Sequence, residues 1–457
     1  MSAAQEHPSA IPLLSRALHQ IRSTPPRIIS SPATQPRRAA VALIIRVSPP
    51  PNFPITSDNT STPTSSPALT EFFQQDWVNA PGARPEILFL RRERPDGSDG
   101  GRMSGIGPGS SEAHVAFPGG RTEDGDEGGM YTAMRQTWEE IGLDLAENAY
   151  TAVGQLDDRE ITTSLGKRLL MILSPYVFLQ LTPHTTSVDP ASGTTLHWVP
   201  FSELLPESVL AGNSSKHVLH ERKPRWSNVT VDASSRLAPR HSTVLRLLMR
   251  LLVGSMKFPA IVIDTSYPTD VHTIGSPSID GKATDEKRGQ VEQGSHLSNL
   301  GRHSSLSKLR PRRRRQELKL WGLSLGMTLD LLAYMAPPVL SSAEGSRRGS
   351  LLPPDSETEA MGVPAMAPSL TSVFPRFSYP DVNFWIWVFG KRYREVVRGW
   401  EASVRAGGVN DRRINWTGSA LNTFYAAVRK ALLLVIVVRA IFVLIGLVLG
   451  GWFLFFR

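Results

Sequence analysis

Apolar and polar positions alternate along this chain in blocks of different period, and these blocks predict where strands and helices form. Short apolar runs rich in β-branched residues indicate buried strands, while apolar residues spaced three and four apart indicate helices. Blocks of both kinds follow one another from residue 37 to residue 336, so they predict one α/β domain. The predicted strands cover residues 37–47, 87–90, 115–117, 150–156, 168–180, 196–199 and 258–263, and the predicted helices cover 130–141, 202–205, 242–253 and 318–335.

Long polar stretches interrupt this domain and surround it. They are rich in Pro, Ser, Thr and Gly, a composition that buries too little apolar surface to fold. We therefore expect a flexible N-terminal arm over 1–36, disordered insertions at about 48–85 and 264–316, and a linker at 339–375. Residues 69–78 form one short amphipathic piece within the first insertion. The arm carries Arg16, Arg22 and Arg27 among few acidic residues, so a mitochondrial presequence is the second interpretation of it.

The end of the chain is almost wholly apolar from residue 431 to residue 456 and is broken by Arg439. A bilayer-spanning helix needs roughly 20 apolar residues, so this block is long enough to cross. A central Arg costs about 3 kcal/mol on insertion scales, which the surrounding Leu, Val, Ile and Phe residues outweigh, and Arg439 can also extend toward the headgroups. Arg429 and Lys430 come just before the block. The sequence thus predicts a single-pass C-terminal anchor in membrane lipid.

The excess of basic residues before this anchor places the main domain on the cytosolic side of the membrane. The receiving membrane stays open among the peroxisome, the mitochondrial outer membrane and the endoplasmic reticulum. Residues 381–405 precede the anchor and are aromatic first and basic later. This amphipathic pattern predicts either a helix lying on the membrane surface or a helix packed on the main domain, and both interpretations stay open.

Composition and charge exclude several kinds of site. The 457 residues include no cysteine, which excludes disulfides, thiolate metal sites and cysteine nucleophiles. The net charge of +9 comes largely from local runs, of which the arginines between 310 and 315 are the sharpest. No aromatic residues are interleaved with this run, and it lies in a predicted insertion. Solvation or attraction to anionic lipid explains it more simply than a nucleic acid does, so no nucleic-acid partner is expected.

The segment from Phe117 to Leu145 carries the chemistry. Gly119 and Gly120 allow the backbone to approach a ligand closely, and an acidic loop and a short helix follow them. Helix positions three and four apart share one face, so Gln136, Glu139 and Glu140 point the same way. Paired carboxylates with a nearby backbone turn suit Mg²⁺ or Mn²⁺ bound to a diphosphate. Arg135 flanks this face and is expected to bind Glu127 in the acidic loop, and Gly142 ends the helix.

This segment resembles the Nudix box, whose pattern is G-x5-E-x7-R-E-U-x-E-E-x-G-U, with U an apolar residue. One residue is inserted after the first glycine, and Thr137 takes the first apolar position. The resemblance implies a Nudix α/β/α sandwich with a mixed sheet and a hydrolase that cleaves a diphosphate bond. The residues at matching positions are Gly120, Glu127, Arg135, Glu139, Glu140, Gly142 and Leu143.

Within that superfamily the chain looks most like the coenzyme A diphosphatase branch. Five segments carry this likeness: FPGGR at 117–121, ILFLRR at 87–92, VGQLDDR at 153–159, HWVPFSELL at 197–205 and LWGLSLGMTLDLL at 320–332. The branch implies cleavage of coenzyme A, or a related nucleoside diphosphate derivative, to 3′,5′-ADP and 4′-phosphopantetheine. SEAH at 111–114 departs from the usual upstream signature.

The resemblance also assigns roles to individual residues. Box positions Glu127 and Gly142 are structural. The catalytic group is Glu139, Glu140, Gln136 and Arg135; the metal ligands are Glu139, Glu140 and Gly120; and the substrate-binding group is Arg91, Arg92, Gly119 and Arg121.

Gln136 is the main departure from the family pattern, which has a glutamate there. An amide offers an oxygen to a metal but carries no charge and accepts no proton near neutral pH. A catalytically weakened Nudix-fold binding module is therefore the alternative to an active hydrolase. If the chain is active, its catalytic base stays open among Asp189, Asp157 and Asp158.

Overall fold

A computed structural model of the chain has the α/β class that the sequence predicts. Among the residues that the structure describes, 12 strands form one sheet, which is mixed because β1 (Arg38–Ser48) runs antiparallel to β2 (Arg84–Arg92) and parallel to β7 (Leu169–Gln180). The structure describes residues 10–31, 37–51, 53–54, 68–92, 113–162, 169–183, 188–205, 210, 224–234, 242–263, 317–335, 376–395 and 419–456. The predicted insertion at 264–316 and the linker at 339–375 lie outside these residues.

The remaining elements follow in chain order. The other strands are β3 (Ala113–Ala116), β4 (Gly119–Arg121), β5 (Tyr150–Gln155), β6 (Arg159–Thr162), β8 (Thr194–Pro200), β9 (Trp226–Asp232), β10 (Ser255–Ile263), β11 (Leu318–Trp321) and β12 (Arg376–Phe377). The helices are α1 (Ile11–Ser23), α3 (Leu69–Phe72), α4 (Asp76–Asn79), α5 (Gly129–Ile141), α6 (Phe201–Leu204), α9 (Thr243–Val253), α10 (Gly322–Met335), α12 (Pro380–Phe389) and α14 (Ser419–Phe456).

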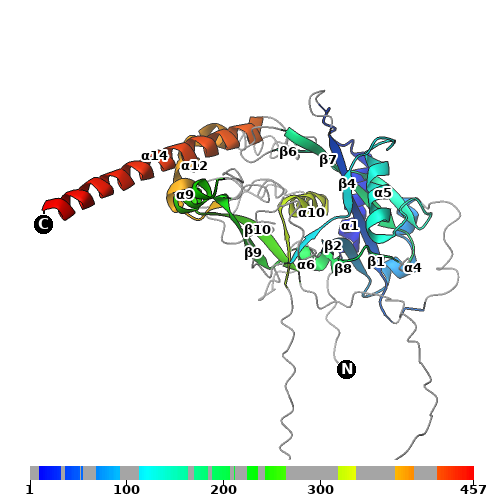
Figure 1. The fold of residues 1–457 in the computed structure, drawn as a ribbon. Helices are drawn as coiled ribbons and strands as arrows, with labels where there is room; N and C mark the ends of the chain where they lie inside the picture. The colour runs from blue at the N-terminus through cyan, green and yellow to red at the C-terminus, as the bar shows by residue number, and fades with distance from the viewer. Residues whose placement is uncertain are drawn as a thin grey trace, which may run out of the picture.

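The centre of the sheet is covered on both faces. Side chains alternate along a strand, so β1 and β2 are apolar on both sides and bury two separate layers. Ala40, Ala42 and Ile44 of β1 pack with α5 on one face, while Leu43 and Ile45 pack with α1 and α10 on the other. The result is the predicted three-layer arrangement, which Figure 1 shows edge-on.

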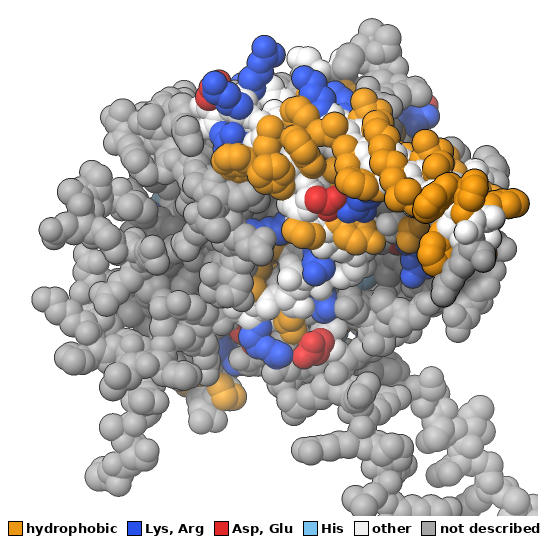
Figure 2. Space-filling model, turned by 90° about the vertical axis from the view of Figure 1, so that its left-hand side faces the viewer, with side chains coloured by type: hydrophobic (Ala, Val, Ile, Leu, Met, Phe, Trp, Pro, Cys, Tyr) orange, Lys and Arg blue, Asp and Glu red, His pale blue; other side chains and the backbone are white. Residues whose placement is uncertain are grey.

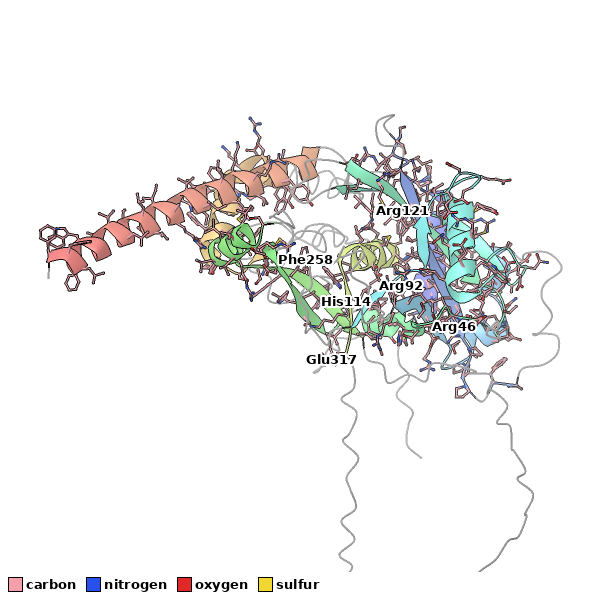
Figure 3. All side chains as sticks on the ribbon, viewed as in Figure 1. Arg46, Arg92, His114, Arg121, Phe258 and Glu317 are labelled. Atoms are coloured by element: carbon pink, nitrogen blue, oxygen red, sulfur yellow. The ribbon has the colours of Figure 1, made fainter. Side chains whose placement is uncertain are left out.

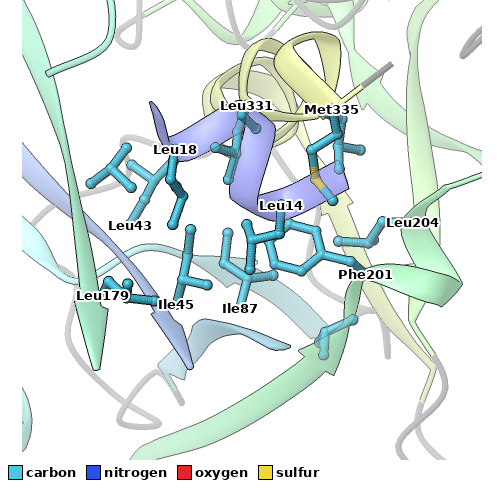
Figure 4. Packing of buried hydrophobic residues seen from close by; sticks show 14 of the residues in the cluster. Leu14, Leu18, Leu43, Ile45, Ile87, Leu179, Phe201, Leu204, Leu331 and Met335 are labelled. Carbon is cyan, nitrogen blue, oxygen red and sulfur yellow. The ribbon is translucent and has the colours of Figure 1, made fainter. Parts of the chain in front are cut away.

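The prediction of a flexible N-terminal arm over 1–36 is wrong for residues 10–31, because these residues belong to the core. Leu14 and Leu18 of α1 are fully buried between the sheet and α10 (Figure 4). Arg16 also donates a hydrogen bond to the carbonyl of Met335 at the end of α10. Apolar residues at 11, 14, 18 and 21 recur with helical spacing and form the buried side of α1.

The predicted insertion at 48–85 is also corrected in its second half. Residues 68–85 form α3, α4 and the start of β2. Phe72 and Trp77 are buried and meet edge to face, with ring centroids 5.6 Å apart. The short amphipathic piece expected at 69–78 is therefore part of the main core.

The path from β3 to β4 brings the glycine pair to the centre of the sheet. β3 pairs with β2 through Leu90 and Arg91, and β4 then pairs with β1 through Ala39–Val41. The chain thus passes from the edge of one strand to the edge of its neighbour within a few residues. This crossing places Gly119 and Gly120 beneath α5.

A second group of elements, which we call the extension, lies at the far end of the sheet. β9 and β12 each pair with β10, and the buried side chains of these strands pack with α9, α12 and α14. Three neighbouring aromatic rings connect this extension to the main body. The ring centroids of His114 and Trp321 are 5.4 Å apart, and those of Trp321 and Phe258 are 5.5 Å apart. The predicted domain end at residue 336 is therefore too early, because β12 lies in the same sheet.

Two further boundaries differ from the prediction. Residues 318–321 are strand β11 rather than the first turn of a helix, and Gly322, with a φ of 63°, begins α10. The C-terminal helix α14 begins at Ser419, and its first half packs against the extension through Phe424, Val428 and Leu432. By length and composition, Thr423–Phe456 is long and apolar enough to cross a membrane, and its most apolar window of 18 residues has a mean hydropathy of 3.2.

The packing of α1 predicts a large effect of truncating its buried side. Leu14→Ala should lower the free energy of unfolding by about 3 kcal/mol, because it leaves a cavity between the sheet and α10. Arg22→Ala, on the exposed side of the same helix, should change it by less than about 0.5 kcal/mol. Thermal unfolding of the full chain in detergent measures both. Equal, negligible effects would mean that α1 is a flexible arm after all.

Candidate active site

Small side chains allow α5 to lie close to β1. Ala133 and Thr137 are fully buried on the helix, and they face Ala40 and Ala42, which are fully buried on the strand. The hydroxyl of Thr137 donates a 2.7 Å hydrogen bond to the carbonyl of Ala133, so it needs no other partner in the interface. A threonine therefore serves at the position where the box pattern has an apolar residue.

The glycine pair lies directly under the same helix. Gly119 has a φ of +147°, and a Cβ at this residue would overlap the backbone of β1 at Ala40 and Val41. A Cβ on Gly120 would overlap the side-chain amide of Gln136. These close approaches explain why the crossing from β3 to β4 carries two glycines.

Glu140 is held at this crossing. One carboxylate oxygen accepts a 2.6 Å hydrogen bond from Arg92, and the other accepts a 3.2 Å hydrogen bond from the backbone N–H of Gly119. Arg92 also donates to the carbonyl of Phe117 at 3.4 Å. Arg92, predicted to bind substrate, therefore lies next to a predicted metal ligand and neutralises part of its charge.

Glu139 lies one residue earlier on α5 and is more exposed. Its two oxygens accept hydrogen bonds from Arg135 at 2.9 Å and from the amide of Gln136 at 2.8 Å. Its side chain is 50% exposed, compared with 22% for Glu140. All the oxygens of the carboxylate pair thus accept protein hydrogen bonds, and each of the two carboxylates pairs with one arginine.

The main partner of Arg135 in the acidic loop is Asp126, and Glu123 lies 3.5 Å from the same guanidinium, so the prediction of Glu127 is wrong. Two nitrogens of Arg135 donate to the two oxygens of Asp126, both at 2.8 Å, in a bidentate pair. Thr132 of α5 also donates to Asp126 at 2.9 Å. Glu127 is exposed. Five residues separate Gly120 from Asp126, as the box pattern requires, so the inserted residue lies after the acidic position rather than before it.

The environment of Asp126 stabilises its charged form. Hydrogen bonds from Arg135 hold the pKa of Asp126 well below its usual range, although burial acts in the opposite direction. The carboxylate is 3% exposed. Arg135 also donates to the carbonyl of Arg121 at 3.3 Å. Arg135 therefore joins the acidic loop, β4 and Glu139 into one rigid unit.

The end of α5 fixes the position of one of the three candidate bases. Gly142 adopts the left-handed conformation, with φ 65° and ψ 20°, and its N–H bonds the carbonyl of Trp138 at 2.8 Å. The N–H of Asp189 bonds the carbonyl of Ile141 at 2.9 Å, and that of Ala191 bonds the carbonyl of Glu140 at 2.9 Å. Asp189 thus lies beside the end of the helix that carries the carboxylate pair, and it is exposed.

The other two candidate bases have structural roles. Asp158 is fully buried, pairs with Arg38 at 2.6 Å and accepts hydrogen bonds from the N–H of Ile29 and from Ser174. Asp157 accepts a 2.9 Å hydrogen bond from the N–H of Arg27. Both therefore attach the chain that follows α1 to the sheet.

The predicted substrate-binding arginines do not share one face. Arg91 and Arg92 are neighbours on β2, so their side chains leave the sheet on opposite sides. Arg92 lies on the side of α5, and Arg91 contributes to lowering the pKa of His197, whose main cause is burial. Arg121 is exposed at one end of β1, and Arg46 lies toward the other end (Figure 3).

Sequence reasoning missed Asp126 and a buried ion pair on the same face of the sheet as α5. Arg46 donates to Glu86 at 2.8 Å and stacks over the ring of Trp198 at 4.1 Å. Both charges sit inside apolar strand runs, and opposite charges at paired positions of neighbouring strands were the signal that would have revealed them.

The chain offers a small set of hard oxygen donors for a metal. Within the part of the chain that the structure describes, no group of three or more His, Cys, Asp or Glu residues is arranged to hold an ion. The donors at the site are the carboxylates of Glu139 and Glu140 and the amide oxygen of Gln136, which lies against Gly120. Mg²⁺ commonly uses one or two carboxylates together with water and substrate phosphate, so this set fits it.

Comparison with known proteins gives a distant relative and distant structures. No protein-family model matches the chain. The "Uncharacterized protein C14C4.10c" of Schizosaccharomyces pombe is 28% identical over 239 residues, which cover 52% of this chain and 59% of that protein. The match thus spans less than two-thirds of the relative's length.

Among solved structures, the chain is similar to the Nudix hydrolase RenU from M. smegmatis, with 15% identity over 36% of this chain and 71% of that chain and a TM-score of 0.20. It is also similar to a MutT/nudix family protein from Enterococcus faecalis, with 10% identity, coverage of 52% and 55%, and a TM-score of 0.20. At these TM-scores the likeness adds no argument of its own about this chain.

The bidentate pair between Arg135 and Asp126 predicts that removing the Asp126 carboxylate lowers stability in a pH-dependent way. Asp126→Asn should lower the free energy of unfolding by about 2 kcal/mol near neutral pH, because it removes charge-assisted hydrogen bonds. The depressed pKa of Asp126 means that the unfolded chain takes up a proton before the folded one does. The difference in unfolding free energy between Asp126→Asn and the parent should therefore have its largest value above about pH 5. It should shrink as the pH falls below about 4.

Chemical unfolding across this pH range measures the effect. Glu127→Gln, next in the chain and exposed, is the matched control and should be neutral at every pH. A larger effect at Glu127 than at Asp126 would reverse the assignment of the acidic position.

Proposed function

We propose that this chain is a divalent-metal-dependent Nudix hydrolase that cleaves a diphosphate bond in coenzyme A or a related nucleoside diphosphate derivative. The observation that carries the proposal is the placement of Glu139 and Glu140 on α5 against the glycine pair. Arg135 holds the same helix to the acidic loop at Asp126. A carboxylate pair beside an open backbone turn suits the recognition of a metal–diphosphate complex.

The metal in this proposal is Mg²⁺ or Mn²⁺, held by Glu139 and Glu140 with the amide oxygen of Gln136. When bound, such an ion neutralises charge on the diphosphate and acidifies a coordinated water. Arg92 and the N–H of Gly119 fix the orientation of Glu140. Arg135 and Gln136 do the same for Glu139. The protein therefore presents both carboxylates in fixed positions.

The remaining steps are assigned to residues around this pair. Asp189 is the best placed of the three candidate bases, since its backbone is bonded to the end of α5 while Asp157 and Asp158 are engaged elsewhere. In the proposal its carboxylate accepts a proton from the attacking water. Arg92 and Arg121 supply positive charge near the glycine pair and favour an anionic substrate.

A specific observation also favours the alternative, a Nudix-fold binding module with weakened catalysis. Gln136 carries no charge, and its amide N–H₂ is engaged in a hydrogen bond with Glu139. Each oxygen of Glu139 and Glu140 accepts a protein hydrogen bond. A site whose carboxylates are already paired with its own arginines can bind a diphosphate without turning it over quickly.

The second part of the proposal is that α14 anchors the chain in a membrane with the α/β domain on the cytosolic side. The long apolar helix and the basic residues Arg429 and Lys430 before it support this topology. The receiving organelle stays open among the three named from the sequence.

Metal-dependent hydrolysis tests the enzymatic proposal. The full chain in detergent should release 3′,5′-ADP and 4′-phosphopantetheine from coenzyme A when Mg²⁺ or Mn²⁺ is present, as resolved by chromatography. Acyl-coenzyme A, ADP-ribose and capped RNA complete the panel. Glu139→Gln and Glu140→Gln should each lower kcat/KM by about a hundredfold or more, because each removes a carboxylate that holds the metal ion, and the ion stabilises the charge of the reacting diphosphate.

Glu147→Gln, at an exposed position beyond α5, is the control and should leave the activity unchanged. Turnover of another panel member in place of coenzyme A would overturn the substrate and keep the reaction class. No metal-dependent turnover of any member would overturn the enzymatic proposal.

Restoring the family glutamate separates the two candidate functions. If the chain is a weakened catalyst, Gln136→Glu should raise kcat by roughly a hundredfold, the range that one positioned acid or base contributes. If Gln136 already serves as a neutral ligand in an efficient enzyme, the substitution should leave kcat within a few-fold of the parent. Binding of coenzyme A by calorimetry, measured on the same variants, shows whether affinity and turnover change separately.

A further inference from the structure

Helix α9 presents an apolar stripe to the outside of the protein. Val244, Leu247, Leu248 and Leu251 follow the spacing i, i+3, i+4 and i+7, so they form one face. Their exposed fractions are 77%, 71%, 46% and 68%. The helix is attached through its other side, where Val253 is buried with the core of the extension. A stripe of this kind normally faces a core.

Helix α12 adds a second set of exposed apolar side chains. Phe384 is 54% exposed, and Trp387, Val388 and Phe389 are each more than one-third exposed. Large side chains gathered over neighbouring elements mark an interaction surface rather than scattered exposure. Figure 2 shows hydrophobic side chains collected on the side of the molecule from which α14 projects.

Tyr379 connects these two helices to α14. Its hydroxyl donates a 3.2 Å hydrogen bond to the carbonyl of Leu251 in the last turn of α9. The same residue precedes the first residue of α12, and its ring centroid lies 4.3 Å from the guanidinium carbon of Arg439 in α14. The exposed stripe of α9 therefore ends close to the point where α14 leaves the folded protein.

Arg439 marks that point. It pairs with Asp381 of α12 at 2.6 Å, and both side chains are partly exposed. Leu432 and Val435, before it, are buried in the extension, while large apolar side chains from Val437 onward are exposed. About 17 residues follow Arg439 in the helix, a length of about 25 Å, which is close to the thickness of a bilayer core.

Basic side chains lie on the same elements. Arg250 of α9 is 74% exposed, with Asp232 at 4.0 Å, and Lys391, Arg392 and Lys430 are exposed around the start of the span. Positive charge beside an apolar face is the composition of helices that lie in the surface of an anionic membrane.

We propose that α9 and α12 form a second membrane contact, in which they lie in the headgroup region of the bilayer that α14 crosses. The stripe of α9 enters the acyl boundary, and the Arg439–Asp381 pair sits at headgroup level. The proposal rests on the membrane anchor proposed above and adds to it: the α/β domain is fixed against the surface by three helices rather than suspended from one.

Spin labels in the full chain test this contact, and the absence of cysteine provides a clean background. Single variants Leu247→Cys, Leu251→Cys and Phe384→Cys are labelled and reconstituted in phosphatidylcholine vesicles that contain a minority of phosphatidylserine. Power saturation then compares collisions with oxygen, which enters lipid, and with a water-soluble nickel chelate. All three labels should favour oxygen.

Two labels act as references. Phe442→Cys, in the exposed part of α14, should report lipid, and Glu147→Cys, beyond α5, should report water. A lipid signal at 442 with a water signal at 247 and 251 would overturn the second contact while leaving the anchor intact. A water signal at 442 would overturn both. Labels at residue 247 of two copies of the chain could also broaden each other's spectra while the nickel chelate still reaches them. That result would assign the stripe to contact with a second copy and overturn the proposal.

Discussion

The close approach between α5 and the glycine pair is the constraint on which the rest of the site depends. Glu140 reaches the backbone N–H of Gly119 only because small residues on both elements, Ala133 and Ala40 among them, let the helix lie against the strand. A larger side chain at any of these positions would move the carboxylate away from the turn. The charge arrangement at the site is therefore a consequence of packing in the layer below it.

The second constraint is electrostatic balance. Two carboxylates on adjacent residues repel each other, and here Arg92 compensates one while Arg135 compensates the other. Arg135 also pairs with Asp126 and with Glu123, so four acidic and two basic groups form one network. An amide at position 136 fits into this network because it adds a donor and no further negative charge. The substitution that casts doubt on turnover thus makes the site internally consistent as a binding surface.

The sequence predicted the parts of the fold whose signal is local. The strands at 37–47 and 168–180 have continuous apolar runs, and the helix at 130–141 has regular spacing and a glycine stop. Helix α1 was missed because prolines and arginines surround its apolar positions, and their burial depends on α10, more than 300 residues later. β12 is two residues long, and it can be recognised as a strand only from its pairing with β10.

The residues of the candidate site could likewise be predicted only where their signal is local. The carboxylate pair and the glycines were identified by spacing, but adjacent acidic residues at 126 and 127 have nearly equal spacing to Arg135, and contact alone decides between them. Neighbouring arginines on β2 look equivalent in the sequence, although strand geometry sends them to opposite faces. Which of three aspartates lies near the helix depended on the path of the loop around Asp189.

Helix α14 serves two purposes without interruption. Its first half completes the core of the extension through Phe424, Val428 and Leu432, and its second half projects beyond the protein (Figure 1). A continuous helix has no hinge, so a force or rotation applied to the projecting half acts directly on the core. It also means that removing the helix at its start leaves a hole in the folded part, so a shortened form of this protein has to retain the residues up to Val435 to keep that core filled.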